Sequence, residues 1–201
     1  MIGNDIALAT IDNGCYADYL GKSGLDVIIK PPSASPAAIY NQILDETKQR
    51  YVCFIHSDVT CNGLLQAIRK TIEASPGYVL GVVGVDKEGY IWSNAYGLRD
   101  IITCDSCCVV IDKEMGLRFD DKLFDGLHLY VEDICMQAGK VTTMFIDAFD
   151  GLHVPPNIHL SGMFNNFIHH SYTYRKLGPM WGDYRKYKAL LEAKWPGVKT
   201  T

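Results

Sequence analysis

The residues best suited to chemistry are His56, Ser57 and Asp58, which directly follow an apolar segment at 51–55. An imidazole and a carboxylate two positions apart, at the end of a buried strand, can together hold a divalent cation. The alternative is that both side chains only bond the backbone of the turn, as such residues commonly do. The spacing by itself leaves both alternatives open.

Two adjacent carboxylates, Glu132 and Asp133, form the second candidate group, near the start of a short amphipathic helix expected from about Val131. A carboxylate beside a reacting centre can act as a general base. Acidic residues in the first turn of a helix also simply complement its dipole. Because successive helical residues point about 100° apart, we expect only one of the two to face a cleft.

Histidines gather late in the chain, at positions 153, 159, 169 and 170. His153 follows an Asp-Gly turn after a strand-like segment, so it can turn toward a metal held elsewhere. A histidine-rich surface loop is the simpler alternative, and His153 needs partners before it is read as a ligand.

The chain holds seven cysteines, an odd number that cannot pair completely within one molecule. Cys104 and Cys107 form one Cys-x-x-Cys, but no second ligand pair follows at the spacing of a zinc site. The pair opens an apolar run rather than a helix, unlike a thioredoxin-type site. We therefore expect small buried core residues, with a cysteine-based metal or redox protein as the alternative.

The elements that must position these groups follow from hydrophobic pattern and turn residues. We expect strands at 6–11, 26–30, 51–55 and 78–85, a helix that starts at Ser35-Pro36, and a helix over 64–72. This β-β-α-β-α-β order indicates an α/β sheet with largely parallel strands, whose ligands lie beyond the carboxyl ends. If the first strands are adjacent and parallel, Asp12, Lys30 and the 56–58 triplet share one edge.

The second half has a different character. Residues 86–100 are polar and glycine-rich and are expected to form a loop, followed by strands at 108–111 and 141–146. From Phe164 onward the pattern predicts helix, rich in aromatic and basic residues. Its last part is amphipathic, so it either packs back on the domain or rests on a membrane surface.

Composition restricts the class of protein. A chain of 201 residues with 48% hydrophobic residues suits one globular domain, or one domain with a small appendage. The formal net charge of −4 argues against a nucleic-acid-coating protein. No apolar run approaches the roughly 20 residues of a membrane helix, and the start lacks the pattern of a signal peptide. We expect a cytoplasmic protein, with membrane association through the C-terminal helix as the alternative.

Together these segments resemble a known family. The runs at 39–44, 51–59, 104–111 and 119–138 are similar, in order and spacing, to family 2-like glycosyltransferases with the GT-A fold. They are most similar to the subgroup whose Asp-x-Asp motif begins with His. The resemblance implies a GT-A-type, Rossmann-like, mixed and mostly parallel sheet flanked by helices. It places a catalytic nucleotide-sugar domain at 1–160 and a helical extension at 161–201 that packs on the domain or contacts acceptor or membrane.

The resemblance also implies residue roles. Asp58, His56 and His153 would hold Mn²⁺ or Mg²⁺, and Asp133, with Glu132 beside it, would supply the base. The nucleotide-sugar residues that it implies are Thr10, Asp12, Lys30, Asn41, His56 and Asp105. One departure is the sequence Lys30-Pro31-Pro32, where many members of the family carry acidic residues.

The implied activity is a metal-dependent, hexosyltransferase-type transfer of a sugar from a UDP- or GDP-sugar donor to a hydroxyl acceptor, with inversion. The acceptor would be a glycan, a lipid or a protein-linked sugar, and no nucleic acid would be bound. An acidic chain can bind an anionic donor when a cation supplies the local positive charge. The alternative is a non-catalytic nucleotide-sugar or carbohydrate-binding module on the same fold, which would bind without turnover.

Overall fold

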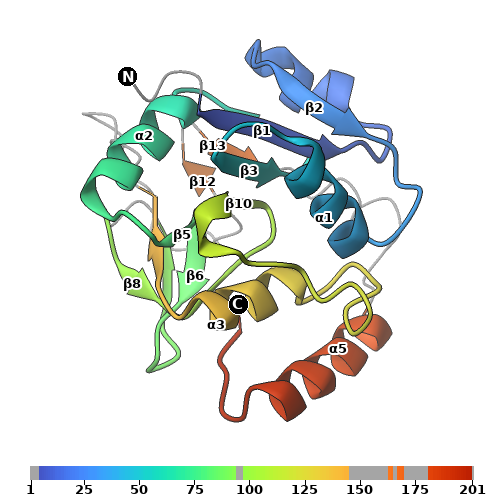
Figure 1. The fold of residues 1–201 in the computed structure, drawn as a ribbon, viewed down its shortest axis with the longest axis vertical. Helices are drawn as coiled ribbons and strands as arrows, with labels where there is room; N and C mark the ends of the chain where they lie inside the picture. Colours follow the sequence, from blue (N-terminus) through green and yellow to red (C-terminus); the bar gives the residue numbers. More distant parts are fainter. Residues whose placement is uncertain (1–4, 94–96, 145–162, 165–166, 170–180, 201) are drawn as a thin grey trace.

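A central mixed sheet organises the computed structural model, which describes residues 5–93, 97–144, 163–164, 167–169 and 181–200 (Figure 1). In these residues seven strands form this sheet, in the order β2-β1-β3-β10-β5-β11-β8. Their bounds are β1 Ile6–Ile11, β2 Val27–Lys30, β3 Tyr51–Ile55, β5 Val79–Gly81, β8 Asp100–Ile101, β10 Cys108–Asp112 and β11 Val141–Thr143.

Strand directions settle the fold class. β2, β1 and β3 are adjacent and parallel, and β11 is parallel to β5. β10 runs antiparallel to both β3 and β5, and β8 runs antiparallel to β11. Among the strands that the structure describes, most of the main sheet therefore points one way. The predicted α/β class, with a mixed and mostly parallel sheet, is confirmed.

Helices cover both faces of this sheet. α1 (Pro36–Glu46), α3 (Tyr130–Ala138) and α5 (Trp181–Lys194) pack on one face, and α2 (Leu64–Ala74) packs on the other. Side chains alternate along a strand, so Val52 and Phe54 of β3 face α1 and α3 while Cys53 and Ile55 face α2. Burial on both faces explains why β3 is apolar throughout.

Local signals fix the ends of the helices near the sheet edge. The Ser35 hydroxyl accepts a hydrogen bond from the Ala38 backbone N–H, and Pro36 occupies the first helical position of α1. α3 begins after Leu129, whose φ of 65° lies in the left-handed region that a side chain disfavours. Short 3-10 turns occur at Tyr16–Asp18, Leu20–Ser23 and Lys113–Met115.

The expected loop at 86–100 is partly wrong, because it contains the strand β7 (Ile91–Ser93). β7 pairs with β6 (Val83–Val85), which also pairs with β9 (Thr103–Cys104) to form a second, three-stranded sheet. The expected strand 78–85 is accordingly split between β5 and β6. Gly81 and Gly84 permit this switch, since a Cβ at Gly84 would lie 2.3 Å from Thr103 O.

The expectation of helix from Phe164 onward is also partly wrong. Within the described residues, β12 (Met163–Phe164) pairs with β13 (Phe167–His169), and β13 pairs with β4 (Val59–Cys61). The partner strand lies far away in sequence, so local pattern could not reveal it. α5 is helical and packs on the domain through buried Tyr187 and Leu191. No helix in the described part of the chain has both the length and the apolarity needed to cross a bilayer.

The cysteines are core residues, as predicted. All seven lie in described segments, are buried and form no disulfide. Burial raises the pKa of the Cys107 and Cys108 thiols well above its usual value, which keeps them protonated and unreactive.

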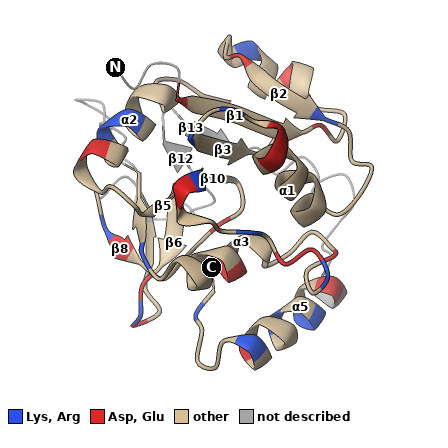
Figure 2. Ribbon diagram, viewed as in Figure 1, with Lys and Arg blue, Asp and Glu red and all other residues tan. Residues whose placement is uncertain are grey.

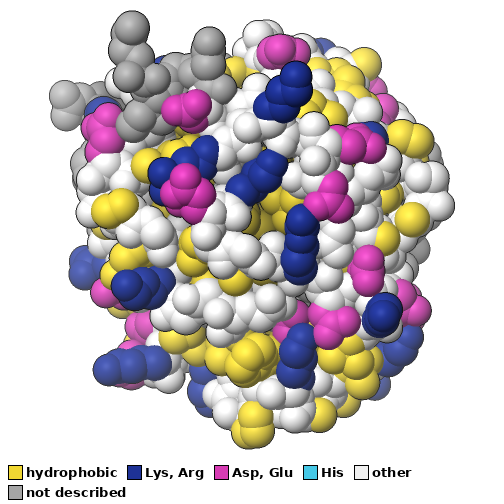
Figure 3. Space-filling view, viewed as in Figure 1, with side chains coloured by type: hydrophobic (Ala, Val, Ile, Leu, Met, Phe, Trp, Pro, Cys, Tyr) yellow, Lys and Arg dark blue, Asp and Glu magenta, His cyan; other side chains and the backbone are white. Residues whose placement is uncertain are grey.

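Charged residues of both signs are interspersed on the surface. Figure 2 shows acidic and basic residues close together on α5, and Figure 3 shows dark blue and magenta side chains mixed over the face in view. Ion pairs join several of them, such as Lys186 of α5 with Asp125, whose Nζ and Oδ1 atoms are 3.5 Å apart. The face in view therefore lacks a broad field of a single sign.

An aromatic cluster packs between α1, β3 and α3. The rings of Tyr40 and Phe54 stack with centroids 4.2 Å apart, and Phe119 and Tyr130 meet Tyr40 edge-on. Aromatic pairs of this kind stabilise the fold beyond the effect of the apolar area that they bury. The cluster therefore fixes the position of α3 relative to β3.

Replacing Phe54 with Ala should lower the free energy of unfolding by about 3–5 kcal/mol, because a fully buried ring leaves a cavity. Urea unfolding followed by circular dichroism measures the change. The matched control is Tyr90→Ala, which truncates a ring that is 66% exposed and should change stability little. Equal effects of the two substitutions would contradict this account of the core.

Candidate functional site

The carboxyl ends of β2, β1 and β3 meet at one edge of the sheet, as the sequence predicted. Ile11 pairs with Lys30 in parallel register, and the Asp12 backbone N–H donates to Lys30 O at 2.9 Å. His56 follows β3 at the same edge. Ligands of such sheets bind beyond this edge, so it is the first place to look for a site.

A second loop joins the 56–58 loop from a distant part of the sequence. β10 is antiparallel to β3 with Cys108 opposite Ile55, so the chain just before β10 lies where β3 ends. The His56 backbone N–H donates to Cys107 O at 3.0 Å and fastens the two loops together. Besides burial, the charges of Asp105 and Asp58 raise the pKa of the Cys107 thiol, so both carboxylates lie close to that residue.

The side chains of His56 and Asp58 lie close together, within the largest separation that two ligands of one cation can have. His56 Nδ1 and Asp58 Oδ1 are 4.0 Å apart, and the Asp58 side chain is nearly buried while that of His56 is 30% exposed. Two donors each about 2.1 Å from a shared cation lie at most about 4.2 Å apart. Three or more clustered His, Cys, Asp or Glu ligands occur nowhere in the part of the chain that is described, and His153, His159 and His170 lie outside that part.

The turn after β1 supports the loop that carries His56 and Asp58. Asp12 Oδ1 accepts hydrogen bonds from the backbone N–H groups of Gly14, Cys15 and Tyr16, between 2.9 and 3.1 Å. The buried Ser57 hydroxyl donates to Asn13 Oδ1 at 2.9 Å. Asp12 therefore shapes the turn that supports the 56–58 loop, and its contact with a nucleotide stays a prediction.

Three other residues implied by the resemblance have contacts of their own. Lys30 Nζ bonds Glu46 Oε2 at 2.7 Å, and the Asn41 amide both donates to and accepts from the backbone of Phe119. Thr10 is fully buried, and its hydroxyl has no hydrogen-bond partner among the described residues. None of these contacts reaches the 56–58 loop, and the predicted nucleotide-binding roles of these residues stay predictions.

Tyr130 links α3 to the joined loops. Its hydroxyl interacts with the side chains of Ser106 and Tyr40, and its pKa is raised mainly by burial and further by the charges of Glu132 and Asp105. Glu132 also acts electrostatically on Cys104, the residue before Asp105. The buried Glu132 carboxylate therefore lies on the side of α3 that faces the 104–106 segment.

Asp133 points to α5 instead. Its carboxylate is fully buried and accepts from Trp195 Nε1 at 2.8 Å and Gln137 Nε2 at 2.8 Å, with Lys194 Nζ 2.9 Å from Oδ1. The expected divergence of the two acidic side chains therefore agrees with these contacts. Nothing in the contacts supports the preference for Asp133 over Glu132 as the base.

Lys194 and Trp195 are site-supporting residues that sequence reasoning missed. Lys194 Nζ also bonds Asp120 Oδ2 at 2.9 Å, and this bond lowers the pKa of Asp120. The signal available in the sequence was a basic and aromatic C-terminal segment, but it carried no indication of which acid it meets.

Comparisons with known proteins give a partial likeness of fold. No family model matches the chain, and no curated protein matches its sequence. Among solved structures it is similar to the 1–349 segment of TarS from S. aureus, with 11% identity, TM-score 0.48 and coverage of 69% of this chain and 57% of that one. This chain thus spans just over half the length of that TarS segment.

Two further solved structures are similar to the chain. A197 from STIV shares 11% identity at a TM-score of 0.47, with coverage of 69% of this chain and 80% of that one. A variant of Drosophila β-1,4-galactosyltransferase 7, solved with manganese, UDP-Gal and xylobiose, shares 14% identity at a TM-score of 0.45 and covers 85% of this chain and 72% of that one. At these values neither an activity nor a residue role follows from the likeness.

If Asp133 anchors α5, Asp133→Asn should lower the free energy of unfolding by about 2–3 kcal/mol, through the loss of hydrogen bonds to a charged group. Urea unfolding measures the change. The control is Asp45→Asn, which breaks the exposed ion pair with Arg118 and should have little effect. Unchanged stability of Asp133→Asn would remove the anchoring role.

Proposed function

We propose that the chain is a metal-dependent glycosyltransferase that moves a sugar from a nucleotide-sugar donor to a hydroxyl acceptor. The observation that carries the proposal is the hydrogen bond from His56 N to Cys107 O. It joins two loops beyond the carboxyl edge of a mixed sheet, one with His56 and Asp58 and one with Asp105. Ser106 of the second loop interacts with Tyr130 of α3. A cation ligand pair next to a carboxylate on a fixed helix is what sugar transfer from a diphosphate needs.

The donor end of the proposed site is built on Asp58 and His56, which would hold Mn²⁺ or Mg²⁺. When bound, the ion would neutralise the charge that develops on the departing diphosphate. Such ions are commonly held by one or two protein ligands together with substrate phosphates. The two side chains Asp58 and His56 therefore suffice to bind such an ion. Similar solved structures include TarS with UDP-GlcNAc, which makes UDP the first nucleotide to test.

The acceptor end is assigned to Glu132. A hydroxyl is a poor nucleophile and needs a base within hydrogen-bond reach. Glu132 lies toward the 104–106 segment, whereas the Asp133 carboxylate is engaged by Lys194 and Trp195. Glu132 would therefore take the acceptor proton, and direct attack by that acceptor would invert the anomeric centre. Asp105 would orient a sugar hydroxyl between the two ends.

The second candidate is a non-catalytic nucleotide-sugar or carbohydrate-binding module. It uses the same His56 and Asp58 pair and predicts donor binding with neither transfer nor hydrolysis. Both candidates require the joined loops, so only turnover separates them. The cytoplasmic location and the membrane contact of the C-terminal segment stay predictions beside either candidate.

Replacing Asp58 with Ala should weaken binding of UDP in the presence of Mn²⁺ by more than about tenfold, since a nearly buried metal ligand is lost. Isothermal titration calorimetry with and without Mn²⁺ measures this. Asp18→Ala is the control, because that carboxylate is exposed near the same edge and is assigned no contact with the ion. Wild-type affinity in the Asp58 variant would exclude the proposed metal position.

Replacing Glu132 with Gln should leave UDP affinity unchanged and reduce the release of UDP from a UDP-sugar by about 10²–10⁴-fold, the usual contribution of a general base. A coupled assay of UDP release measures the rate. Asp133→Asn should keep turnover per folded molecule. The reverse result, with turnover lost only in Asp133→Asn, would return the role of base to Asp133.

A further inference from the structure

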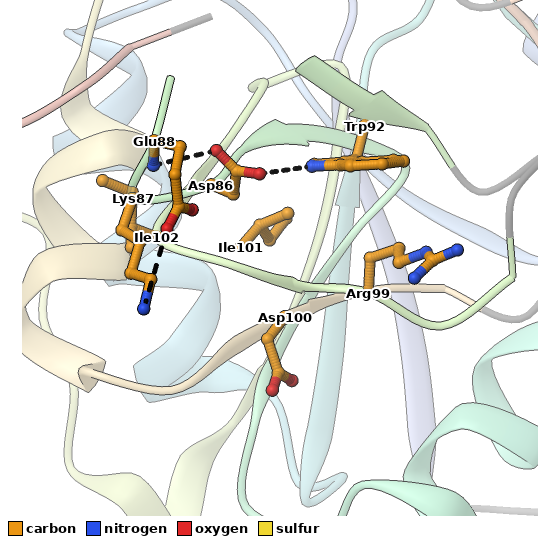
Figure 4. A pocket seen from close by; sticks show the side chains of 8 residues that line it. All are labelled: Asp86, Lys87, Glu88, Trp92, Arg99, Asp100, Ile101 and Ile102. Atoms are coloured by element: carbon orange, nitrogen blue, oxygen red, sulfur yellow. Dashed lines mark hydrogen bonds and ion pairs between the residues drawn. The ribbon is translucent and has the colours of Figure 1, made fainter. Parts of the chain in front are cut away.

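The two edges of the main sheet differ in character. β8 forms one edge and is only two residues long. The charged side chains of Arg99 and Asp100 lie around Ile101 there, along a pocket of about 480 Å³ (Figure 4). Shortness and charge are common means of protecting a sheet edge against pairing with another chain. β2 forms the other edge, at the rim of the molecule in Figure 1, and is apolar along its middle.

Two adjacent isoleucines are exposed in the middle of β2. Ile28 is 37% exposed and Ile29 is 46% exposed, and they are two of the five exposed large hydrophobic side chains in the described part of the chain. Successive side chains of a strand point to opposite faces, so both faces of the sheet are apolar at this edge. Such an edge favours the addition of a further strand.

The backbone of β2 also has unpaired groups on its outer side. Lys30 O accepts from the Asp12 backbone N–H at 2.9 Å, so the backbone groups of Lys30 point inward, toward β1. Because these directions alternate along a strand, the N–H and C=O groups of Val27 and Ile29 point outward. Within the described segments no strand lies beyond β2, and no backbone group bonds these two residues from that side. Two donors and two acceptors are therefore available to a partner strand.

One antiparallel register lets a second copy of β2 use all four groups. When Ile28 lies opposite Ile28 of the second copy, Val27 of each chain lies opposite Ile29 of the other. These are the outward-facing residues, so each of the two pairs can exchange two hydrogen bonds. The same register places Asp26 opposite Lys30, twice by symmetry, on the face that carries Ile28.

The charges at the ends of β2 select this register. Asp26 is exposed, and within the described residues no hydrogen bond or ion pair engages its carboxylate. Lys30 Nζ bonds Glu46 Oε2 at 2.7 Å, but an ammonium has three N–H donors and can meet a second carboxylate. Sliding one strand by two residues in either direction sets Asp26 or Lys30 opposite Ile28 instead, which leaves the charges unpaired.

We propose that the chain forms a symmetric dimer in which β2 pairs antiparallel with β2 of a second copy. The main sheets of the two copies then form one continuous sheet across a two-fold axis at Ile28. The pairing uses β2 of both copies, so assembly stops at two chains. Because the two copies run in opposite directions, their candidate sites open at opposite edges of the continuous sheet. The dimer does not depend on the proposed transferase function.

Sedimentation velocity of the full chain over a wide range of concentration tests the dimer. Asp26→Lys should raise the dimer dissociation constant by about tenfold or more, since like charges then lie opposite each other at two places. Combining Asp26→Lys with Lys30→Asp restores opposite charges across the axis and should restore the dimer. Lys87→Asp changes an exposed charge away from β2 and should dimerise as the wild type does.

Ile28→Cys tests the register without changing a charge. Oxidation with diamide should join two copies of this variant through a disulfide, because the two residues face each other at the two-fold axis. The native cysteines are all buried and do not compete. Ile29→Cys is the control, since its counterpart lies a diagonal step away, about 7–8 Å, which is too far for a disulfide.

A dimer that is lost in Asp26→Lys and restored by the second substitution, together with cross-linking through Ile28→Cys, supports the proposal. A wild-type chain that stays monomeric at every concentration would overturn it. The same holds for a dimer that is indifferent to Asp26→Lys, or that is cross-linked through Ile29→Cys and not through Ile28→Cys. Oligomers that keep growing with concentration would also contradict it, since they indicate unspecific pairing of edges.

Discussion

The site depends on one arrangement, the insertion of antiparallel β10 between β3 and β5. An antiparallel strand begins where its parallel neighbours end. Its leading loop, with Asp105 and Cys107, is therefore delivered to the edge at which β3 releases His56. The hydrogen bond from His56 N to Cys107 O then satisfies a backbone donor and fixes the spacing of the two loops. A parallel strand in this place would send Asp105 to the opposite edge of the sheet.

Much of the first half could be predicted from the sequence because its signals are local. Continuous apolar runs bounded by turn residues gave β1 and β3, and Ser35-Pro36 gave the start of α1. The same information predicted the shared edge of Asp12, Lys30 and His56. The pairing of β13 with β4 has no local signal, since its partner lies far away in sequence. The β7 strand was missed because its apolar and aromatic run, Tyr90-Ile91-Trp92, is only three residues long within a polar, glycine-rich segment.

For the adjacent acids Glu132 and Asp133, the sequence predicts only part of the arrangement. Helical geometry predicts that adjacent side chains diverge, but it cannot say which of Glu132 and Asp133 faces the sheet edge. That depends on α5, whose Lys194 and Trp195 provide a cation and an indole N–H for Asp133. A buried carboxylate must be paired, so these contacts fix the rotation of α3 about its axis. At its start the same helix is held by Tyr130, which interacts with Ser106 and Tyr40.

Charge gives the proposed site its requirement for a cation. Asp58, Asp105 and Glu132 bring three carboxylates toward one edge of a chain whose formal net charge is −4. In the low dielectric near buried groups, a diphosphate placed among them would meet strong repulsion. A divalent ion held by Asp58 would reverse the sign of that interaction. Under the proposed function, the acidity of the chain, which at first argues against an anionic ligand, would therefore make donor binding at this edge conditional on the metal.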